Sequence, residues 1–464
     1  MKLKLTLSFF LVLFAIGTGQ AQYKDLFDFN GTNGAQCNGA ITLSNNDSIL
    51  YGMTLQGGSN GDGLIFSVHN DGTGYFELLD CHDNYGENPP GSLILSGNTL
   101  YGMANAGGAT FQGIIFSLHT DSTGFTDLHD FNGTTGEWPN GSLILVGNTL
   151  YGLATSGGIG PGNGYGCVFS VDTSGLVYKD LYNFTGSDGN RPYGSLLFSN
   201  NVLYGTTFQG GANNDGVIFS INPDGSGYKD LFDFNGTNGK NPYCTLALSG
   251  NVLYGTTHTG GANNYGSIFS IHTDGSAFKD VFDFSFTNGA NPYSSLTLAG
   301  NTLYGMTNLG GTDSLGTIFS ILTDGTGFST LYNFDGTSGS NPQGDLTFSK
   351  NGKTMYGMTY SGGAIGDGVI FSFDIITSGI PQLSATGNSF TVYPNPCKGN
   401  FVLETISTEK QFLTISDVNG KVVLGQIIEA PKTTLFTNNF APGVYTIGMN
   451  GNQEIERKKL VIIR

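Results

Sequence analysis

The chain has 464 residues, a formal net charge of −17 and only 11% charged residues. This negative balance disfavours nucleic acid and anionic lipid as partners, because both repel an acidic surface. Glycine is abundant at 74 residues, yet 34 phenylalanines and 22 tyrosines supply enough aromatic surface to bury a core. Many turns between short strands account for both features, so the composition favours an all-β protein.

The first 21 residues have the pattern of a removable secretory signal. Lys2 and Lys4 give a basic start, the stretch 5–16 is mostly apolar, and 19–21 (Gly-Gln-Ala) is a small-residue cleavage site. The apolar run is shorter than the roughly 20 residues that a membrane anchor needs. We therefore expect export, a mature chain that starts near Gln22, and no transmembrane segment in it.

A repeat with a period of about 50 residues fills the middle of the chain. Its marker is a Tyr-Gly dipeptide, followed by Gly-Gly and then by an apolar segment that ends in Phe-Ser. The tyrosines are Tyr51, Tyr101, Tyr151, Tyr204, Tyr254, Tyr304 and Tyr356. The phenylalanines are Phe66, Phe116, Phe169, Phe219, Phe269, Phe319 and Phe371. Seven copies in phase indicate a repeat architecture.

Each copy contains four short segments rich in β-branched and aromatic residues, separated by Gly, Asn, Asp and Pro. In one copy these segments are 228–234, 245–249, 252–257 and 267–271. Four strands in this period are typical of a propeller blade. We predict that residues 22–373 form a seven-bladed β-propeller of four-stranded blades, with the Phe-Ser phenylalanines packed between blades. The alternative is a β-solenoid, whose coils usually repeat in fewer residues.

Connection lengths predict where one blade ends and the next begins. The segment 274–276 (Asp-Gly-Ser) is a short hairpin signal, whereas 235–242 is too long for a tight turn and is predicted to cross between blades. The N-terminal segment 23–29 is identical to 228–234, and it precedes the first complete copy. We predict that it closes the ring beside 368–373, covering an edge that could otherwise pair with other chains.

The Gly-Gly loops and the crossings are predicted to share one face, where a rigid scaffold would carry any binding function. Asp62, Asp215 and Asp367 each precede a glycine on that face, and we take them as candidate ligand-binding residues, although turn chemistry explains the same pattern. Trp138, the only tryptophan, lies in a crossing and could either stack on a sugar or pack against the protein.

No residue is assigned a catalytic or metal-binding role. The sequence contains no Gly-x-Ser-x-Gly, His-Glu-x-x-His or phosphate-loop motif. The five cysteines are widely spaced and include no CxxC pair, which argues against a disulfide framework and a zinc site. We expect no cofactor, although the Asp- and Asn-rich loops could hold calcium through oxygen ligands.

The repeat resembles a known family. Leu-Tyr-Gly-Thr-Thr, Gly-Gly, Gly-x-Ile-Phe-Ser and Asp-Gly-Ser-Gly are similar to the tandem GloVer repeat of exported bacterial proteins, over residues 23–373. The third strand departs from the pattern at Ala104 and Ala154, where the other copies carry threonine. The resemblance implies a secreted or surface repeat protein and does not imply a particular chemistry.

The period stops after Phe373. Residues 374–388 have the composition of a linker, and 389–464 contain about seven short strands separated by turns, which predicts a small Ig-like β-sandwich. The tail carries a set of spaced motif residues: Tyr393, Pro394, Asn395, Pro396, Gly399, Asp417, Gly420, Gly443, Tyr445 and Lys459. This set resembles the type A sorting domain of the type IX secretion system, and the resemblance implies transport by the secretion machinery across the outer membrane, by way of the periplasm.

Two functions follow from these features as hypotheses. The first is a secreted or cell-surface scaffold that binds a glycan or a protein. The second is an extracellular carbohydrate-active enzyme, a glycoside hydrolase or lyase, which would need catalytic side chains that break the symmetry of the repeat. The fold alone does not choose between them.

Overall fold

The computed structural model describes residues 22–159, 164–375, 390–405, 411–417, 421–428, 430, 432–437, 440–450 and 455–463. The chain divides into two compact units, Met1–Ile376 and Thr377–Arg464. The predicted signal peptide (1–21) and the predicted linker from residue 376 onward lie outside the described residues.

The N-terminal unit is an all-β propeller of antiparallel four-stranded sheets, as predicted. Its described residues form seven sheets, one of which has a fifth strand, β10. The first four sheets are β2 (Thr42–Leu43), β3 (Ile49–Thr54), β4 (Leu64–His69), β5 (Phe76–Asp80); β6 (Ile94–Ser96), β7 (Thr99–Ala104), β8 (Ile114–His119), β9 (Thr126–Asp130); β10 (Glu137–Pro139), β11 (Ile144–Val146), β12 (Thr149–Ser156), β13 (Cys167–Asp172), β14 (Tyr178–Asn183); and β15 (Leu197–Ser199), β16 (Val202–Thr207), β17 (Val217–Ile221), β18 (Lys229–Asp233). The other three are β19 (Ala247–Ser249), β20 (Val252–Thr257), β21 (Ser267–His272), β22 (Lys279–Asp283); β23 (Thr297–Ala299), β24 (Thr302–Thr307), β25 (Thr317–Leu322), β26 (Ser329–Asn333); and β27 (Thr347–Phe348), β28 (Thr354–Met358), β29 (Val369–Asp374), β1 (Gln22–Asp28). A short 3-10 helix, η1 (Asp83–Tyr85), lies in one crossing.

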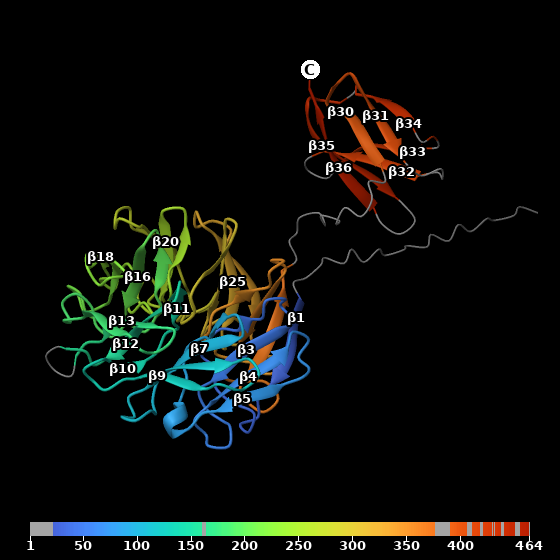
Figure 1. Cartoon of the computed structure of the whole chain (residues 1–464). Helices are drawn as coiled ribbons and strands as arrows, with labels where there is room; N and C mark the ends of the chain where they lie inside the picture. The colour runs from blue at the N-terminus through green and yellow to red at the C-terminus, as the bar shows by residue number, and fades with distance from the viewer. Residues whose placement is uncertain are drawn as a thin grey trace, which may run out of the picture. The chain divides into compact units, whose positions relative to one another are not determined.

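Strand β1 completes the last sheet, whose order is β1-β29-β28-β27. It runs antiparallel to β29, with Tyr23 opposite Phe373 and Asp28 opposite Val369, so the predicted pairing of the N-terminal strand is confirmed. The Tyr23 ring also stacks on Tyr332 of the preceding sheet, with centroids 4.3 Å apart. Figure 1 shows β1 beside the orange strands of the last repeat. The two ends of the repeat region are therefore joined in one sheet.

The Phe-Ser phenylalanines lie between sheets, as predicted. Phe219 is fully buried and belongs to one apolar cluster with Tyr151 and Val168 of the preceding sheet. On its own sheet it faces Gly205, the glycine of the Tyr-Gly dipeptide. A Cβ at Gly205 would lie 2.5 Å from Cζ of the Phe219 ring. The dipeptide recurs because the ring occupies the space that a side chain would need.

The C-terminal unit is one continuous arrangement of strands in the order β33-β32-β35-β36-β30-β31-β34. β30 pairs with β31 through its first residues and with β36 at Cys397, so it links two ladders. One apolar core includes Phe401, Leu413 and Ile447, the arrangement expected of a small sandwich. The strands are β30 (Phe390–Lys398), β31 (Asn400–Thr405), β32 (Gln411–Ser416), β33 (Val422–Ile428), β34 (Lys432–Phe436), β35 (Gly443–Asn450) and β36 (Ile455–Ile462).

Candidate functional site

The crossings and the Gly-Gly loops lie together on one face of the N-terminal unit, as predicted. The N–H of Gly261 donates to the carbonyl of Gly236 at 2.9 Å, and the backbones of Lys240 and Thr259 exchange two hydrogen bonds. Similar bonds join loop and crossing in the other sheets. We call the surface made by the crossings and the Gly-Gly loops the loop face.

The three candidate aspartates occupy equivalent positions in three different sheets. The carbonyls of Asp62, Asp215 and Asp367 accept N–H groups from the neighbouring crossings at 2.7, 2.8 and 3.1 Å. The Asp215 carboxylate also forms an ion pair with Lys240 at 2.8 Å. The backbone of each aspartate thus anchors the neighbouring crossing, and the structure does not bring the three carboxylates together. Their role in binding a ligand stays a prediction.

Trp138 lies at the start of the third sheet and is 48% exposed. Its N–H donates to the carbonyl of Gln112 at 3.0 Å, and its own carbonyl accepts the Thr155 hydroxyl at 2.7 Å. The backbone is left-handed, with φ at +53°. About half of the Trp138 side chain is therefore available to solvent.

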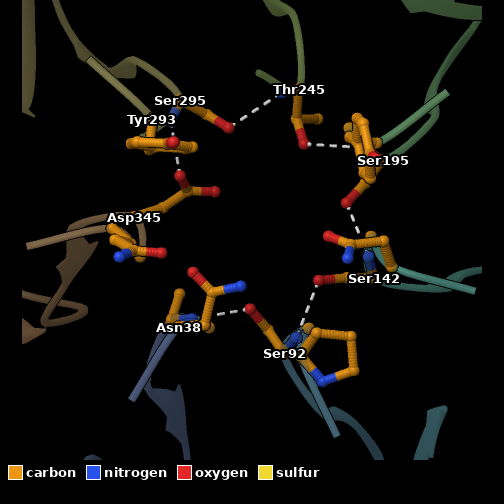
Figure 2. A pocket seen from close by; sticks show the side chains of 18 of the residues that line it. Asn38, Ser92, Ser142, Ser195, Thr245, Tyr293, Ser295 and Asp345 are labelled. Carbon is orange, nitrogen blue, oxygen red and sulfur yellow. Dashed lines mark hydrogen bonds between the residues drawn. The ribbon is translucent and has the colours of Figure 1, made fainter. Parts of the chain in front are cut away.

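The innermost strands surround a narrow central channel, seen from close by in Figure 2. Residues from seven equivalent segments line it: 38–40, 90–92, 140–142, 193–195, 243–245, 293–295 and 343–345. Each segment joins a crossing to an innermost strand, so the channel runs inward from the loop face. The backbones of neighbouring segments are in close contact here. A Cβ at Gly39, for example, would lie only 2.0 Å from the carbonyl oxygen of Gly91.

A chain of hydrogen bonds links these segments around the channel (Figure 2). In each bond, a backbone N–H donates to a side-chain oxygen of the next repeat. The successive residues are Ala40, Ser92, Ser142, Ser195, Thr245, Ser295 and Asp345, and the distances run from 2.5 to 3.2 Å. The side chains at this position therefore hold neighbouring blades together at their inner ends.

Asp345 is the only carboxylate among the channel-lining residues. Equivalent residues of the other repeats are Ser, Thr or Ala. Burial in the channel raises the pKa of Asp345, and the hydrogen bonds that it accepts from Ser295 oppose that rise. The side chain could hold or release a proton, but no second carboxylate lines the channel to act with it.

Tyrosine side chains narrow the channel on one side. Tyr193 and Tyr243 stack with centroids 4.7 Å apart, and the Tyr243 hydroxyl reaches Asn140 at 3.3 Å. The remaining space is about 50 Å³. A space of this size holds a few water molecules, and it is too small for a sugar ring.

Sequence reasoning missed the channel residues. One available signal was the variation directly after the crossings, where the repeats carry Asn38, Pro90, Asn140, Tyr193, Tyr243, Tyr293 and Gln343. A position that varies while its neighbours repeat is one that blade packing does not fix.

The outer strands carry pairs of carboxylates that predict a dependence of stability on pH. Burial, followed by repulsion from Asp28, Asp130, Asp233 and Asp283 respectively, raises the pKa of Asp25, Asp127, Asp230 and Asp280 to about 6. A carboxyl group whose pKa is higher in the folded state stabilises the fold at low pH, and this contribution is lost as pH rises through 6. We expect the midpoint of thermal unfolding to be higher at pH 5 than at pH 8.

Asp230→Asn provides the matched test. It should raise the midpoint at pH 8 and change it little at pH 5, because Asp230 is largely protonated there in the fold. A midpoint that increases steadily from pH 5 to pH 8, in both the parent and the variant, would contradict the assigned pKa values.

Metal and thiol chemistry have no assembled site in the described part of the chain. No group of three or more His, Cys, Asp or Glu side chains is placed to hold a metal ion there. All five cysteines are buried free thiols: Cys37, Cys81, Cys167, Cys244 and Cys397. Calcium binding therefore stays a prediction without a defined site. In the described residues, no helix is long and apolar enough to cross a membrane.

The predicted sorting motif has a structural explanation at several positions. The Asn395 amide donates to the Lys459 carbonyl at 2.6 Å, and its oxygen accepts the Val461 N–H at 2.8 Å. Asn395 thus attaches the bend of β30 to β36. The Tyr445 hydroxyl donates to Ala441 at 2.8 Å, and Gly399 has a φ of +87° that favours glycine.

The other motif residues make fewer contacts that explain their place in the motif. Tyr393 donates to Glu404 at 2.6 Å, and the Asp417 carboxylate accepts the Lys421 N–H at 3.0 Å. Pro394 and Pro396 flank Asn395 within β30, and Gly443 begins β35. Gly420 lies outside the described residues.

Asn395→Ala should destabilise the C-terminal unit by about 1–2 kcal/mol, because it removes both side-chain bonds to β36. Differential scanning calorimetry of residues 22–464 would measure this. The transition of the C-terminal unit should move to lower temperature while that of the propeller stays in place. An unchanged C-terminal transition would contradict the role given to Asn395.

A family model described as the Gloeobacter/Verrucomicrobia repeat matches residues 12–162 and 159–371. The chain belongs to this family. Its Gloeobacter/Verrucomicrobia repeats are followed by a secretion system C-terminal sorting domain, matched over residues 391–463. The protein is therefore a secreted repeat protein that is exported by the type IX system to the cell surface or the extracellular space. No curated protein matches the chain.

Solved structures resemble the repeat propeller at low sequence identity. The extracellular domain of a hybrid two-component system from B. thetaiotaomicron has 13% identity and a TM-score of 0.51, over 96% of this chain and 59% of that one. The chain thus spans about three fifths of that domain's length, and the likeness shows the fold alone. PorZ, a surface component of the type IX secretion system of Porphyromonas gingivalis, has 13% identity and a TM-score of 0.35, over 91% of this chain and 65% of that one. An oligogalacturonate lyase has 9% identity and a TM-score of 0.49, over 77% of this chain and 97% of that one.

Proposed function

We propose that this protein is an extracellular binding module whose propeller presents a ligand-binding surface on its loop face. The ligand is a glycan or a protein outside the cell. The C-terminal sorting domain delivers the propeller to that location, and the propeller supplies a rigid support for the loops.

The observation that carries the proposal is the difference between repeated and diverged positions. The Phe-Ser phenylalanine that packs between blades is the same in every copy. The loop-face position held by Asp62 is also aspartate in two other copies, Asp215 and Asp367, but it is Gln112, Tyr165, Tyr265 and Leu315 in the remaining four. Because packing does not require one residue type there, these side chains are free to suit a ligand.

The alternative function, a carbohydrate-active enzyme, would depend on Asp345. Its raised pKa suits a general acid, and it breaks the symmetry of the channel. The space beside it is too small for a sugar ring, however, and glycoside hydrolysis normally uses two carboxylates. We therefore favour binding without turnover.

The test uses the mature chain, residues 22–464. It is applied to a glycan array and to an array of extracellular matrix and cell-surface proteins, and it is incubated with the same polysaccharides in a reducing-end assay. Saturable binding without release of reducing ends or unsaturated products is expected. Turnover that Asp345→Asn abolishes would replace this proposal with the enzyme, and the absence of saturable binding on both arrays would contradict it.

A further inference from the structure

Two exposed aromatic residues on the loop face have left-handed backbones. Phe111 has a φ of +58° and Trp138 a φ of +53°, and their side chains are 65% and 48% exposed. Bulky residues seldom adopt this conformation because the Cβ crowds the backbone. Such strain persists only where the surrounding structure imposes it, and it concentrates at ligand-binding positions.

At both positions the other repeats mostly carry residues that adopt a left-handed backbone more easily. Those equivalent to Phe111 are Gly61, Gly164, Asn214, Asn264, Ser314 and Gly366, all with positive φ. Four of the six equivalents of Trp138 are asparagines, each of which donates its side-chain amide to a nearby carbonyl: Asn88, Asn241, Asn291 and Asn341. The repeat therefore does not require an aromatic ring at either position.

The two residues belong to one small site. Phe111 precedes Gln112, whose carbonyl accepts the Trp138 N–H at 3.0 Å. The side-chain oxygen Oε1 of Gln112 is buried and has no hydrogen-bond partner. Oε1 of Glu137 and Oε1 of Gln112 both approach Gly133, at 3.2 and 3.4 Å from the position that a Cβ on it would take. The side-chain oxygens of Gln112 and Glu137, each next in sequence to one of the two aromatic residues, therefore lie close to the same backbone position, Gly133.

We infer that the loop face carries a subsite for a neutral polysaccharide, made by four side chains: Phe111, Gln112, Glu137 and Trp138. This inference rests on the proposed binding function and names its ligand class. Sugar rings present C–H groups to the negative face of an aromatic ring, and sugar hydroxyls donate to the partly exposed carboxylate of Glu137. The net charge of −17 and the Glu137 carboxylate disfavour an acidic polysaccharide.

For the variants Phe111→Asn and Trp138→Asn we expect weaker ligand binding without a loss of thermal stability. Each introduces the residue that other repeats carry, so each should keep or raise the midpoint of thermal unfolding, by on the order of 1–2 °C. Each should also weaken binding roughly tenfold, because one stacking surface is lost. A residue that served only to stabilise the propeller would instead lower the midpoint when replaced.

The experiment measures binding by the mature chain to mixed-linkage β-glucan, xylan, galactomannan and polygalacturonate, using affinity electrophoresis. Ile365→Asn is the matched control, since Ile365 is 64% exposed on another Gly-Gly loop. We expect at least one neutral polymer to retard the parent chain, with an affinity about tenfold lower in both aromatic variants and unchanged in the control.

Three results would overturn the subsite. They are neutral-polymer binding that both aromatic variants retain, binding restricted to polygalacturonate, and binding restricted to a protein on the array. All three leave the binding module in place and remove only this subsite or its ligand class. If the parent chain binds none of these polymers and nothing on either array, the proposed function fails together with the subsite.

Discussion

Deleting residues 22–29 should destabilise the propeller by on the order of 5 kcal/mol or more. The segment contributes Phe29, which is fully buried, and Tyr23, which stacks on Tyr332; losing one such buried ring costs about 3–5 kcal/mol. Deletion also removes the antiparallel partner of β29. The exposed edge would then be free to pair with other chains, so we expect aggregation in addition to a lower unfolding midpoint.

A synthetic peptide of residues 22–30 provides the control for this deletion. If the missing strand is the cause, adding the peptide should restore the midpoint, because an extended segment can add to a free sheet edge. Circular dichroism during thermal unfolding measures both effects. A truncated chain as stable as the parent would contradict the closure of the ring by β1.

Gly205→Ala should cost about 2–3 kcal/mol, because the added methyl has no space to occupy. Its carbon would lie 2.5 Å from Cζ of Phe219 and 3.2 Å from Cδ2 of Leu196, and both side chains are buried. Either the ring must leave its position between two sheets or the strands must separate. Urea unfolding of the parent and the variant measures the difference.

Gly250→Ala is the matched control in a tight turn. The site has a φ of +61° and no atom within 4 Å of the added carbon, so only backbone strain of about 1 kcal/mol is expected. Combining Gly205→Ala with Phe219→Leu should recover part of the loss, since leucine leaves room for the methyl. If Gly205→Ala cost no more than Gly250→Ala, the packing explanation of the Tyr-Gly dipeptide would be wrong.

The propeller scaffold was predictable because the sequence repeats the same strand pattern seven times. A single copy of 228–234 would not identify a closing strand, but an identical segment at 23–29 does. The Phe-Ser and Tyr-Gly pairs recur together because the phenylalanine ring packs over the glycine. Their repetition shows that the pairing is not accidental. The Asn395 motif was recognised from its residues, although the bonds from its amide to β36 needed coordinates.

The candidate site was predictable only in part. Trp138 could be selected because it is the only tryptophan, but Phe111 looks like any loop residue until the Gly-Gly loops are superposed. The left-handed backbone of Phe111 and the unpaired side-chain oxygen of Gln112 become visible only in the three-dimensional structure. Asp345 was missed because nothing local in its sequence shows that it faces a channel.

The central claim is that repeated residues build the scaffold while the diverged loop-face residues 111–112 and 137–138 contact the ligand. Hydrogen–deuterium exchange of the mature chain, with and without the neutral polysaccharide that binds best, tests it most directly. We predict slower exchange confined to the backbone amides of 107–113 and 132–138. Protection confined to the hairpins on the opposite face, or to the segments that line the central channel, would contradict it.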